Sequence, residues 1–433
     1  MRIDAYIAGR WHHCADLSGG AGNRQNAVRL TYAADYAAEH LFARDLRAVS
    51  VRLPVDFGDR QCEEWPAFLI DLLPQGAARK RLERTAGVAL TEWDVLQRGA
   101  FNPVGNLRVI PDVIPPSLAH RPFELAEMTQ RGDEFLEYAA GVGAAVTGAT
   151  DTQGEAPKFW VVQNREGLWF PDDGSCDAFA VNHALLKFPV PDAGPNAELI
   201  LRTEAAYQRV ARHIGLRTTE ELPQFIDGAL LVPRFDRRGA EGHVERLGVE
   251  SLYSVTGITS AGHPLQHGQV LVELARVVTD FNTELREYVW RDLLNLALGN
   301  RDNHGRNTAI LKDTDGTMQL APLFDVGPTF LDARAITRVL RWEGEEPGQL
   351  NWPAIIERVA IRAREAHVEI DEQVFAQAVG DFGELAADLP AVMKQCGVDD
   401  LILEYRRSHV DRVLNTLVDM PRSHRSGHAP SSP

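Results

Sequence analysis

The chain has 433 residues, more than one ordinary domain contains, and its 44% hydrophobic and 24% charged residues are typical of a globular protein. Its net charge of −16 weighs against direct binding along a nucleic-acid backbone, because such affinity comes from many Lys and Arg contacts. The sequence contains no run of about 18 apolar residues, so a membrane-spanning helix is not expected.

The cysteines and the first residues of the chain bear on its location. The four cysteines are widely separated and form no CxxC pair, which is not the spacing of a disulfide framework or a zinc site. The sequence begins MRIDAYIAGRWHH, without a basic segment followed by an apolar one, so a secretory signal is not expected. Both observations favour a cytoplasmic protein.

The first part of the chain combines strand and helix patterns. Short strands are expected where apolar residues alternate or run together. These segments are 5–9, 27–32, 49–55 and 105–111. Helical periodicity occupies 65–87, where proline and glycine interrupt it, and 90–100. The proline-containing run at 113–123 is interpreted as a linker. Residues 1–123 are therefore expected to form a small α/β domain.

The middle of the chain, residues 124–236, is rich in β-branched and aromatic residues. The expected strands are KFWVVQN (158–164), GLWFP (167–171), HALLKFPV (183–190) and the first half of GALLVPRFDRR (228–238). A clear amphipathic helix occupies 197–216. This part is predicted to be a strand-rich lobe.

Helical patterns dominate residues 237–420, and the tail at 421–433, rich in Pro, Ser, Gly and His, is expected to be disordered. The helical segments are 269–278, 286–300, 351–366, 371–389 and the stretch near 401–419. The whole is an α+β protein in which a strand-rich lobe precedes a helical lobe. A cleft between two such lobes suits nucleotide binding.

The strongest chemical signal is GNRDNHGRNTAIL (299–311), in which Asp302 and Asn307 have the D-x-x-x-x-N spacing of a kinase catalytic loop. The segments TAIL and MQLAPLFD are predicted to form a hairpin that returns Asp325 to the side of Asn307, and the D-V-G at 325–327 resembles D-F-G. Asp302 would orient an attacking hydroxyl, and the oxygens of Asn307 and Asp325 suit Mg²⁺. The alternative is that Asp302 and Asn307 only form turns and that Asp325 is a cap.

Other parts of a nucleotide site are predicted upstream. Lys187 lies in an apolar strand, where burying its charge is costly unless an opposite charge pairs with it. In a nucleotide site, ATP phosphates and Glu204 on the next helix would pair with Lys187. The alternative is an edge strand in which Lys187 points to solvent. Backbone N–H groups of the loop at 146–159, which contains Gly154, would cradle phosphates. Lys158 either contacts phosphate or lies on the surface.

The segment LLVPRFDRR is interpreted as the connection between the lobes, with the backbone from Val232 to Phe235 facing adenine. This placement follows from the order of the segments along the chain.

Taken in order, these motifs resemble the HipA family of bacterial toxin kinases over nearly the whole chain. The matching segments are PAFLIDLLPQGAARKRL, FNPVGNL, APKF, LLKFP, LRTEAAYQRVARHIGL, PRFDRR, NRDNHGRN and PLFDVGPT. The resemblance implies a protein/lipid-kinase-like bilobal fold with an added N-terminal domain, and ATP and Mg²⁺ as cofactors. By motif match, Asp302 is the catalytic aspartate, Asn307 and Asp325 hold the metal, and Lys187 binds ATP. His304 matches a family position in the catalytic loop and is expected to support the nucleotide site structurally.

The resemblance also implies phosphorylation of Ser or Thr on a protein, with aminoacyl-tRNA synthetases as known family targets, and arrest of growth. Family members commonly pair with a small helix-turn-helix antitoxin that binds DNA. The loop here resembles that of stand-alone members, so an adjacent antitoxin is not assumed.

The chain departs from the family pattern at two positions. Asp151 stands where family kinases carry the serine that they autophosphorylate, which leaves the flanking Thr150 and Thr152 as candidate autophosphorylation sites. Pro233 stands where the family usually has an acidic residue, which removes a side-chain contact and a backbone donor near adenine.

Two other functions stay open. One is a catalytically weak scaffold acting with a DNA-binding antitoxin. The other is a Mg²⁺-dependent nuclease, because two metal-binding carboxylates can also cleave a phosphodiester. The acidic net charge and the Lys187–Glu204 arrangement favour a kinase.

Overall fold

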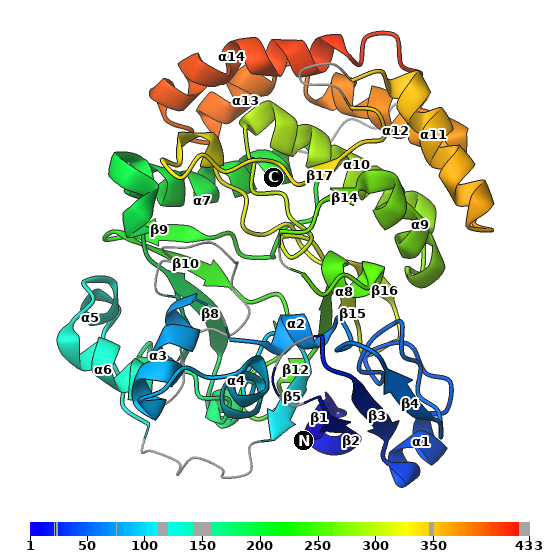
Figure 1. Ribbon diagram of the computed structural model, residues 1–433. Coiled ribbons are helices and arrows are strands. Elements are labelled where there is room, and N and C mark those ends of the chain that lie inside the picture. Colours follow the sequence, from blue (N-terminus) through cyan, green and yellow to red (C-terminus); the bar gives the residue numbers. More distant parts are fainter. Residues whose placement is uncertain are drawn as a thin grey trace.

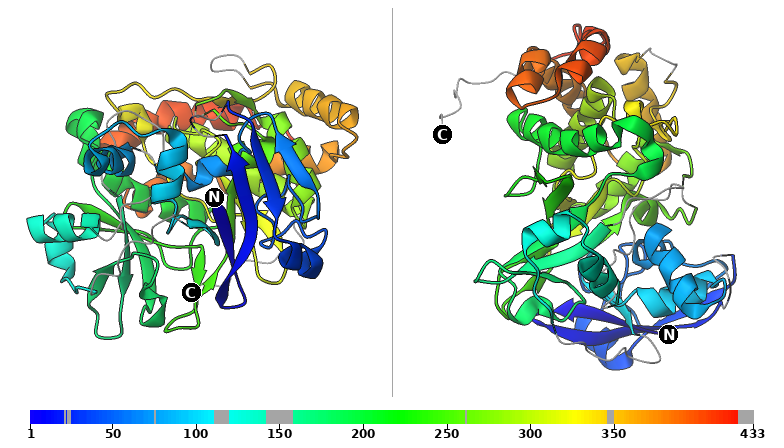
Figure 2. Two further views of the ribbon diagram at one scale, coloured as in Figure 1. Left: turned by 60° about the horizontal axis from the view of Figure 1, so that its bottom comes forward. Right: turned by 90° about the vertical axis from the view of Figure 1, so that its left-hand side faces the viewer.

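The computed structural model describes residues 1–20, 22, 25–74, 76–110, 120–141, 158–260, 262–345 and 350–423. Thr150, Asp151, Thr152 and Gly154, with the phosphate-loop prediction that rests on them, lie outside the described residues, as does the tail from residue 424. A helical lobe forms one end of the molecule, and the N-terminal sheet lies at the opposite end (Figures 1 and 2). Within the described residues, no helix combines the length and apolarity needed to span a bilayer.

The N-terminal domain is an antiparallel sheet covered by short helices. Its strands are β1 (Arg2–Ile7), β2 (Arg10–Gly19), β3 (Val28–Tyr32), β4 (Asp59–Cys62) and β5 (Leu107–Ile110), in the order β4-β3-β2-β1-β5. Its helices are α1 (Ala34–His40), α2 (Leu69–Leu72), α3 (Gly76–Ala86) and α4 (Glu92–Gly99). The alternation that predicted β3 places Val28, Leu30 and Tyr32 in the core. Helix α1 was not anticipated.

The strand prediction for residues 49–55 is wrong. The segment turns sharply, because the backbone N–H of Leu53 donates to the carbonyl of Ser50. The N–H of Val51 and the hydroxyl of Ser50 donate to the carboxylate of Glu250, 3.0 and 2.6 Å away. A distant buried carboxylate thus satisfies the Val51 N–H, which a strand would have paired with its neighbour, while most of the apolar side chains are still buried.

The strand-rich lobe is built on a second five-stranded antiparallel sheet, in the order β7-β6-β8-β10-β9. Its elements are α5 (Leu125–Thr129), α6 (Asp133–Gly141), β6 (Lys158–Gln163), β7 (Trp169–Pro171), β8 (Asn182–Lys187), α7 (Ala197–His213), β9 (Gln224–Ile226) and β10 (Ala229–Pro233). The sequence predicted β6, β7, β8, α7 and β10; it missed α5 and α6. Aromatic side chains fill the core, with Phe135 and Phe159 in edge-to-face contact.

The helical lobe surrounds α10, in which most residues are buried. The lobe contains the strands β11 (Arg237–Arg238), β12 (Glu245–Arg246), β13 (Gly248–Ser251), β14 (Leu265–Gln266), β15 (Ala309–Lys312), β16 (Met318–Leu320) and β17 (Leu340–Arg341). Its helices are α8 (Leu252–Thr256), α9 (His267–Val277), α10 (Phe281–Leu298), α11 (Trp352–Glu365), α12 (Glu372–Leu385), α13 (Leu389–Gln395) and α14 (Asp400–Asn415). The predicted hairpin is confirmed: β15 and β16 pair antiparallel.

One histidine in this lobe is buried in neutral form. The ring of His267 stacks on Trp342 with centroids 4.3 Å apart, and its Nδ1 lies 2.7 Å from the hydroxyl of Tyr288. Burial lowers the pKa of His267 to about 4, although the carboxylate of Asp292 favours the protonated ring.

His267 should therefore make folding sensitive to acid. Its folded-state pKa lies below the unfolded value, so the unfolded chain binds the extra proton, and stability is lost as pH falls from about 6.5 towards 4. Wild type should lose about 3 kcal/mol more of its free energy of unfolding than His267→Gln between about pH 7 and pH 4, measured by urea titration. Equal losses in both proteins would contradict this account.

Candidate active site

Two lysines face each other at the end of the strand-rich sheet. Lys158 in β6 and Lys187 in β8 are direct partners in the antiparallel register. Like charges placed opposite each other on neighbouring strands are destabilising unless an opposite charge lies between them. The two lysines therefore require a nearby carboxylate to offset their repulsion.

Two carboxylates neutralise the charges of these lysines. The Nζ of Lys187 lies 2.7 Å from Oε1 of Glu204 on α7 and 2.6 Å from Oδ1 of Asp325. The Nζ of Lys158 lies 3.8 Å from Oδ2 of the same aspartate. Lys187 is only 4% exposed, so it does not point to solvent, and its predicted partner Glu204 is in contact with it. Burial opposes its charge, but Asp325 and Glu204 raise the pKa of Lys187, so it stays protonated.

Asp325 adopts a backbone conformation that few non-glycine residues adopt. Its φ is +56°, in the left-handed region, which costs a non-glycine residue of order 1 kcal/mol or more and persists where surrounding contacts enforce it. Although burial acts in the other direction, Lys158 and Lys187 lower the pKa of Asp325, so the carboxylate is ionised. Such outliers concentrate at functional sites.

The loop after α10 carries the predicted catalytic residues. The helix ends at Gly299, which has φ +77°. The Nδ2 of Asn307 donates to the carbonyl of Asp302 at 2.7 Å, which fixes the direction of the amide. The Oδ1 of Asn307 is buried, and none of the described residues donates a hydrogen bond to it. A buried acceptor without a donor is costly unless a ligand satisfies it.

His304 lies inside this loop rather than on the wall of the cleft. Its Nε2 is 3.4 Å from Oδ1 of Asp302, and its ring stacks on Tyr253. Burial raises the pKa of Asp302, repulsion from Asp325 acts in the same direction, and His304 opposes both. His304 thus lies beside Asp302 and favours its ionised form.

A cleft between the lobes brings most of the predicted residues together. It encloses about 1010 Å³ including its open mouth, and it is lined by Lys158, Lys187, Val232, Phe235, Asn307 and Asp325. Phe235 stacks on Phe324 at this wall. The two lysines and Asp325 make one part of the wall charged, whereas Trp160, Leu185 and Val249 make another part apolar. Such a combination suits a ligand with a flat apolar group and a charged tail.

The sequence did not single out several residues of the cleft. Trp160 lines the cleft, and the guanidinium of Arg234 lies 3.9 Å from its ring centroid. Asp71 and Arg306 also line the cleft. An Asp inside the apolar run PAFLIDLL was the available signal for the former, and Arg306 lies within the catalytic-loop motif itself.

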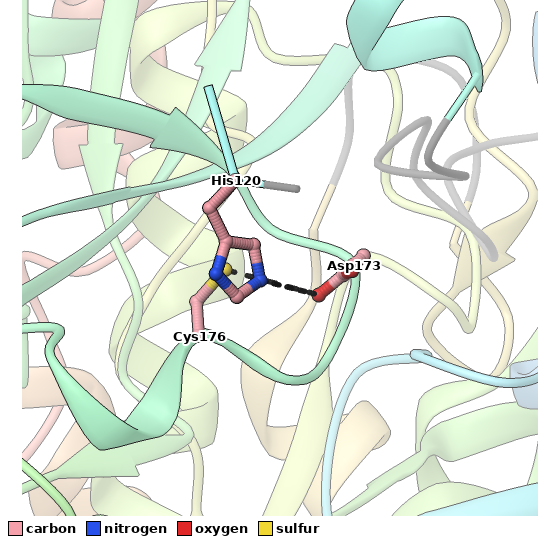
Figure 3. Close-up of side chains that lie close together, drawn as sticks. All are labelled: His120, Asp173 and Cys176. Carbon is pink, nitrogen blue, oxygen red and sulfur yellow. Dashed lines mark hydrogen bonds and ion pairs between the residues drawn. The ribbon is translucent and has the colours of Figure 1, made fainter. Parts of the chain in front are cut away.

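The described part of the chain holds one group of potential metal ligands outside the cleft, His120, Asp173 and Cys176 (Figure 3). His120 Nε2 and Cys176 Sγ each lie 3.8 Å from Asp173 Oδ1. That oxygen already accepts hydrogen bonds from the backbone N–H and hydroxyl of Ser175, and burial raises the pKa of the Cys176 thiol far above its usual value. Turn hydrogen bonding explains the group, and we assign no metal to it.

The fold and the cleft define a kinase-like class of protein: a strand-rich lobe with a paired lysine, a helical lobe with an Asp/Asn loop, and an added N-terminal domain. The HipA-like C-terminal domain family matches residues 150–381, more than half of the chain. The chain belongs to the HipA-like family.

The similarity to two relatives extends over most of the chain. "Putative kinase Y4mE" of Sinorhizobium fredii is 25% identical over 291 residues, which is 62% of this chain and 65% of that protein, just under two thirds of its length. HipA of Shewanella oneidensis MR-1, solved with HipB and its operator DNA as a toxin–antitoxin system, superposes with a TM-score of 0.68 over 96% of both chains at 15% identity. The latter similarity establishes the bilobal α+β fold with its N-terminal domain.

The catalytic loop should be intolerant of a side chain at Gly305. A Cβ there would lie 2.4 Å from Cδ1 of Tyr253, closer than real contacts allow. Gly305→Ala should therefore lower the free energy of unfolding by about 1–3 kcal/mol and weaken amide protection of residues 299–308 in hydrogen exchange. Gly383→Ala, in helix α12 with its nearest contact at 3.3 Å, is the control and should leave this loop protected. Normal protection in Gly305→Ala would contradict the packing argument.

Proposed function

We propose that the chain is an ATP- and Mg²⁺-dependent serine/threonine protein kinase of the HipA toxin type, which phosphorylates a bacterial protein and so arrests growth. One observation carries the proposal: the buried Oδ1 of Asn307 has no donor among the described residues and belongs to the same cleft wall as the ionised Asp325.

The donor set fits Mg²⁺, which prefers oxygen ligands and keeps water and phosphate oxygens as its others. The hydrogen bond from Asn307 Nδ2 to the Asp302 carbonyl fixes the orientation of the amide and so of its Oδ1. The Asp325 carboxylate stays ionised beside two lysines. Bound there, the metal would neutralise phosphate charge during transfer.

The residues of the chain take separate roles in this proposal. Asp302 orients the substrate hydroxyl and accepts its proton, a task that its raised pKa favours. Lys187 and Lys158 hold phosphate oxygens, and Glu204 keeps Lys187 in place. Val232 and Phe235 contact the adenine.

A DNA-binding antitoxin is the partner we propose for the toxin-type activity. The HipA structure from Shewanella oneidensis contains HipB and operator DNA. A net charge of −16 favours reaching DNA through such a partner rather than directly.

Phosphoryl transfer tests the proposed function directly. Purified protein is incubated with γ-labelled ATP and Mg²⁺, alone and with bacterial lysate, alongside Asp302→Ala and Asp325→Ala. Wild type should label a lysate protein, and each variant should lower the rate about a hundredfold or more, because the first removes the base and the second the metal carboxylate. Phosphoamino-acid analysis should find phosphoserine or phosphothreonine.

Asp315→Asn is the matched control, because this exposed aspartate lies in the turn of the β15–β16 hairpin that leads to Asp325. It should transfer label like wild type, and Asp302→Ala should keep the wild-type unfolding midpoint, whereas Asp325→Ala, which removes a partner of the buried Lys187, should lower it while the protein still folds. Label on the enzyme itself that is lost in Thr150→Ala or Thr152→Ala would locate autophosphorylation. Tight ATP binding without transfer would support the scaffold, DNA cleavage without ATP would support the nuclease, and normal transfer by Asp302→Ala would refute the assignment.

A further inference from the structure

A short helix of the N-terminal domain reaches the catalytic loop. Helix α2 lies between the N-terminal sheet and α8, near the centre of the molecule (Figure 1). The carbonyl of Ile70 accepts a hydrogen bond of 2.9 Å from Nη2 of Arg306. Arg306 is 7% exposed and precedes Asn307 in the loop. The N-terminal domain therefore contacts the proposed metal-binding loop directly.

Asp71, the next residue of α2, lines the same cleft as Arg306. Burial raises the pKa of Asp71 to about 6, and the positive charge of Arg306 is the main influence that lowers it. The Asp71 carboxylate thus provides negative charge near the buried guanidinium of Arg306.

Asp71 also supports the loop by a second route. Its Oδ2 accepts a hydrogen bond of 2.8 Å from the backbone N–H of Ser251. The next two residues donate to the catalytic loop: Leu252 N–H to the carbonyl of Thr308 at 3.0 Å, and Tyr253 N–H to that of Gly305 at 3.2 Å. One carboxylate thus holds the segment to which the loop backbone is bonded.

The N-terminal domain is itself anchored beside this contact. Glu250, adjacent to Ser251, accepts bonds from Ser50 and Val51 of the N-terminal domain. The same carboxylate pairs with Lys312 at 3.0 Å, and both of these charged residues are 2% exposed. A fully bonded buried carboxylate resists displacement, so α2 is held at a fixed position relative to the loop.

The geometry points to the N-terminal domain as part of the catalytic machinery: through Ile70 it holds Arg306, and through Asp71 it holds the segment bonded to the loop backbone, so that the loop carrying Asp302 and Asn307 keeps the arrangement for phosphoryl transfer. Asp71 is a positioning residue, because its bonds reach the reacting groups through the loop. The inference rests on the proposed function, since transfer is its first readout.

Asp71→Asn removes the charge that strengthens the bond from the Ser251 N–H and that lies near Arg306, but it keeps the shape of the side chain. It should lower kcat about tenfold or more while the Kd for ATP changes less than about threefold, because the loop acts mainly in the transition state. Asp4→Asn is the matched control: Asp4 is also buried in the N-terminal domain and pairs with Arg2 and Arg108, but it lies in β1. It should lower the unfolding midpoint and leave kcat unchanged.

A double-mutant cycle isolates the link. Asp71→Asn combined with Arg306→Gln should lower kcat by less than the product of the two single-variant factors, because both residues hold the same loop. Additive losses, or a wild-type kcat in Asp71→Asn, would overturn the inference.

Hydrogen exchange separates this inference from the proposed function. Asp71→Asn, and not Asp4→Asn, should lose amide protection in residues 299–308 even in a protein without transfer activity. If wild type does not transfer phosphate but the loop loses protection, the proposed function fails and the link stands. If protection is unchanged, the link fails whatever the activity.

Discussion

The burial of one ammonium group governs how the two lobes meet. Lys187 is almost fully buried at the base of the cleft, and a buried charge is stable only with opposite charges in good geometry. Glu204 comes from the strand-rich lobe, but Asp325 comes from the helical lobe, beyond the β15–β16 hairpin. The second pair forms only when the lobes are docked. The electrostatic requirement of a single lysine therefore helps to hold the two lobes together at the charged wall of the cleft.

The N-terminal domain strengthens this docking by contacting both lobes. Asp236, at the connection between them, accepts the N–H of Gly105, and Arg237 donates to the carbonyl of the same glycine. Gly105 has φ +86°, and a Cβ there would lie 3.1 Å from the backbone nitrogen of Val249, so the close approach favours glycine. Asn102 donates to the carbonyl of Asp172 in the strand-rich lobe. The N-terminal domain therefore contacts both lobes and helps to fix their relative position.

The sequence predicted what depends on local pattern. An isolated lysine in an apolar strand implied a carboxylate partner, and the two runs flanking KDTDG implied a hairpin; both are present. The strand prediction for residues 49–55 was wrong, because Ser50 and Val51 donate hydrogen bonds to Glu250, about 200 residues away in the chain. Asp71 was missed for the same reason: its partner Ser251 is 180 residues distant. Periodicity reports which faces are buried, but it does not report what a buried polar group will meet.

The three residues at the end of the hairpin show how local strain and long-range packing combine at the site. Phe324 stacks on Phe235 at the connection between the lobes, whereas Val326 is fully buried in the core of the helical lobe. Asp325 lies between these two anchors with its left-handed φ, and both of its oxygens face lysines. A Cβ at Gly327 would make only ordinary contacts, so available space does not demand glycine there. The constraint on the D-V-G segment therefore falls on the aspartate, whose backbone strain is maintained by an aromatic stack before it, a buried valine after it and the charges that tie the lobes together.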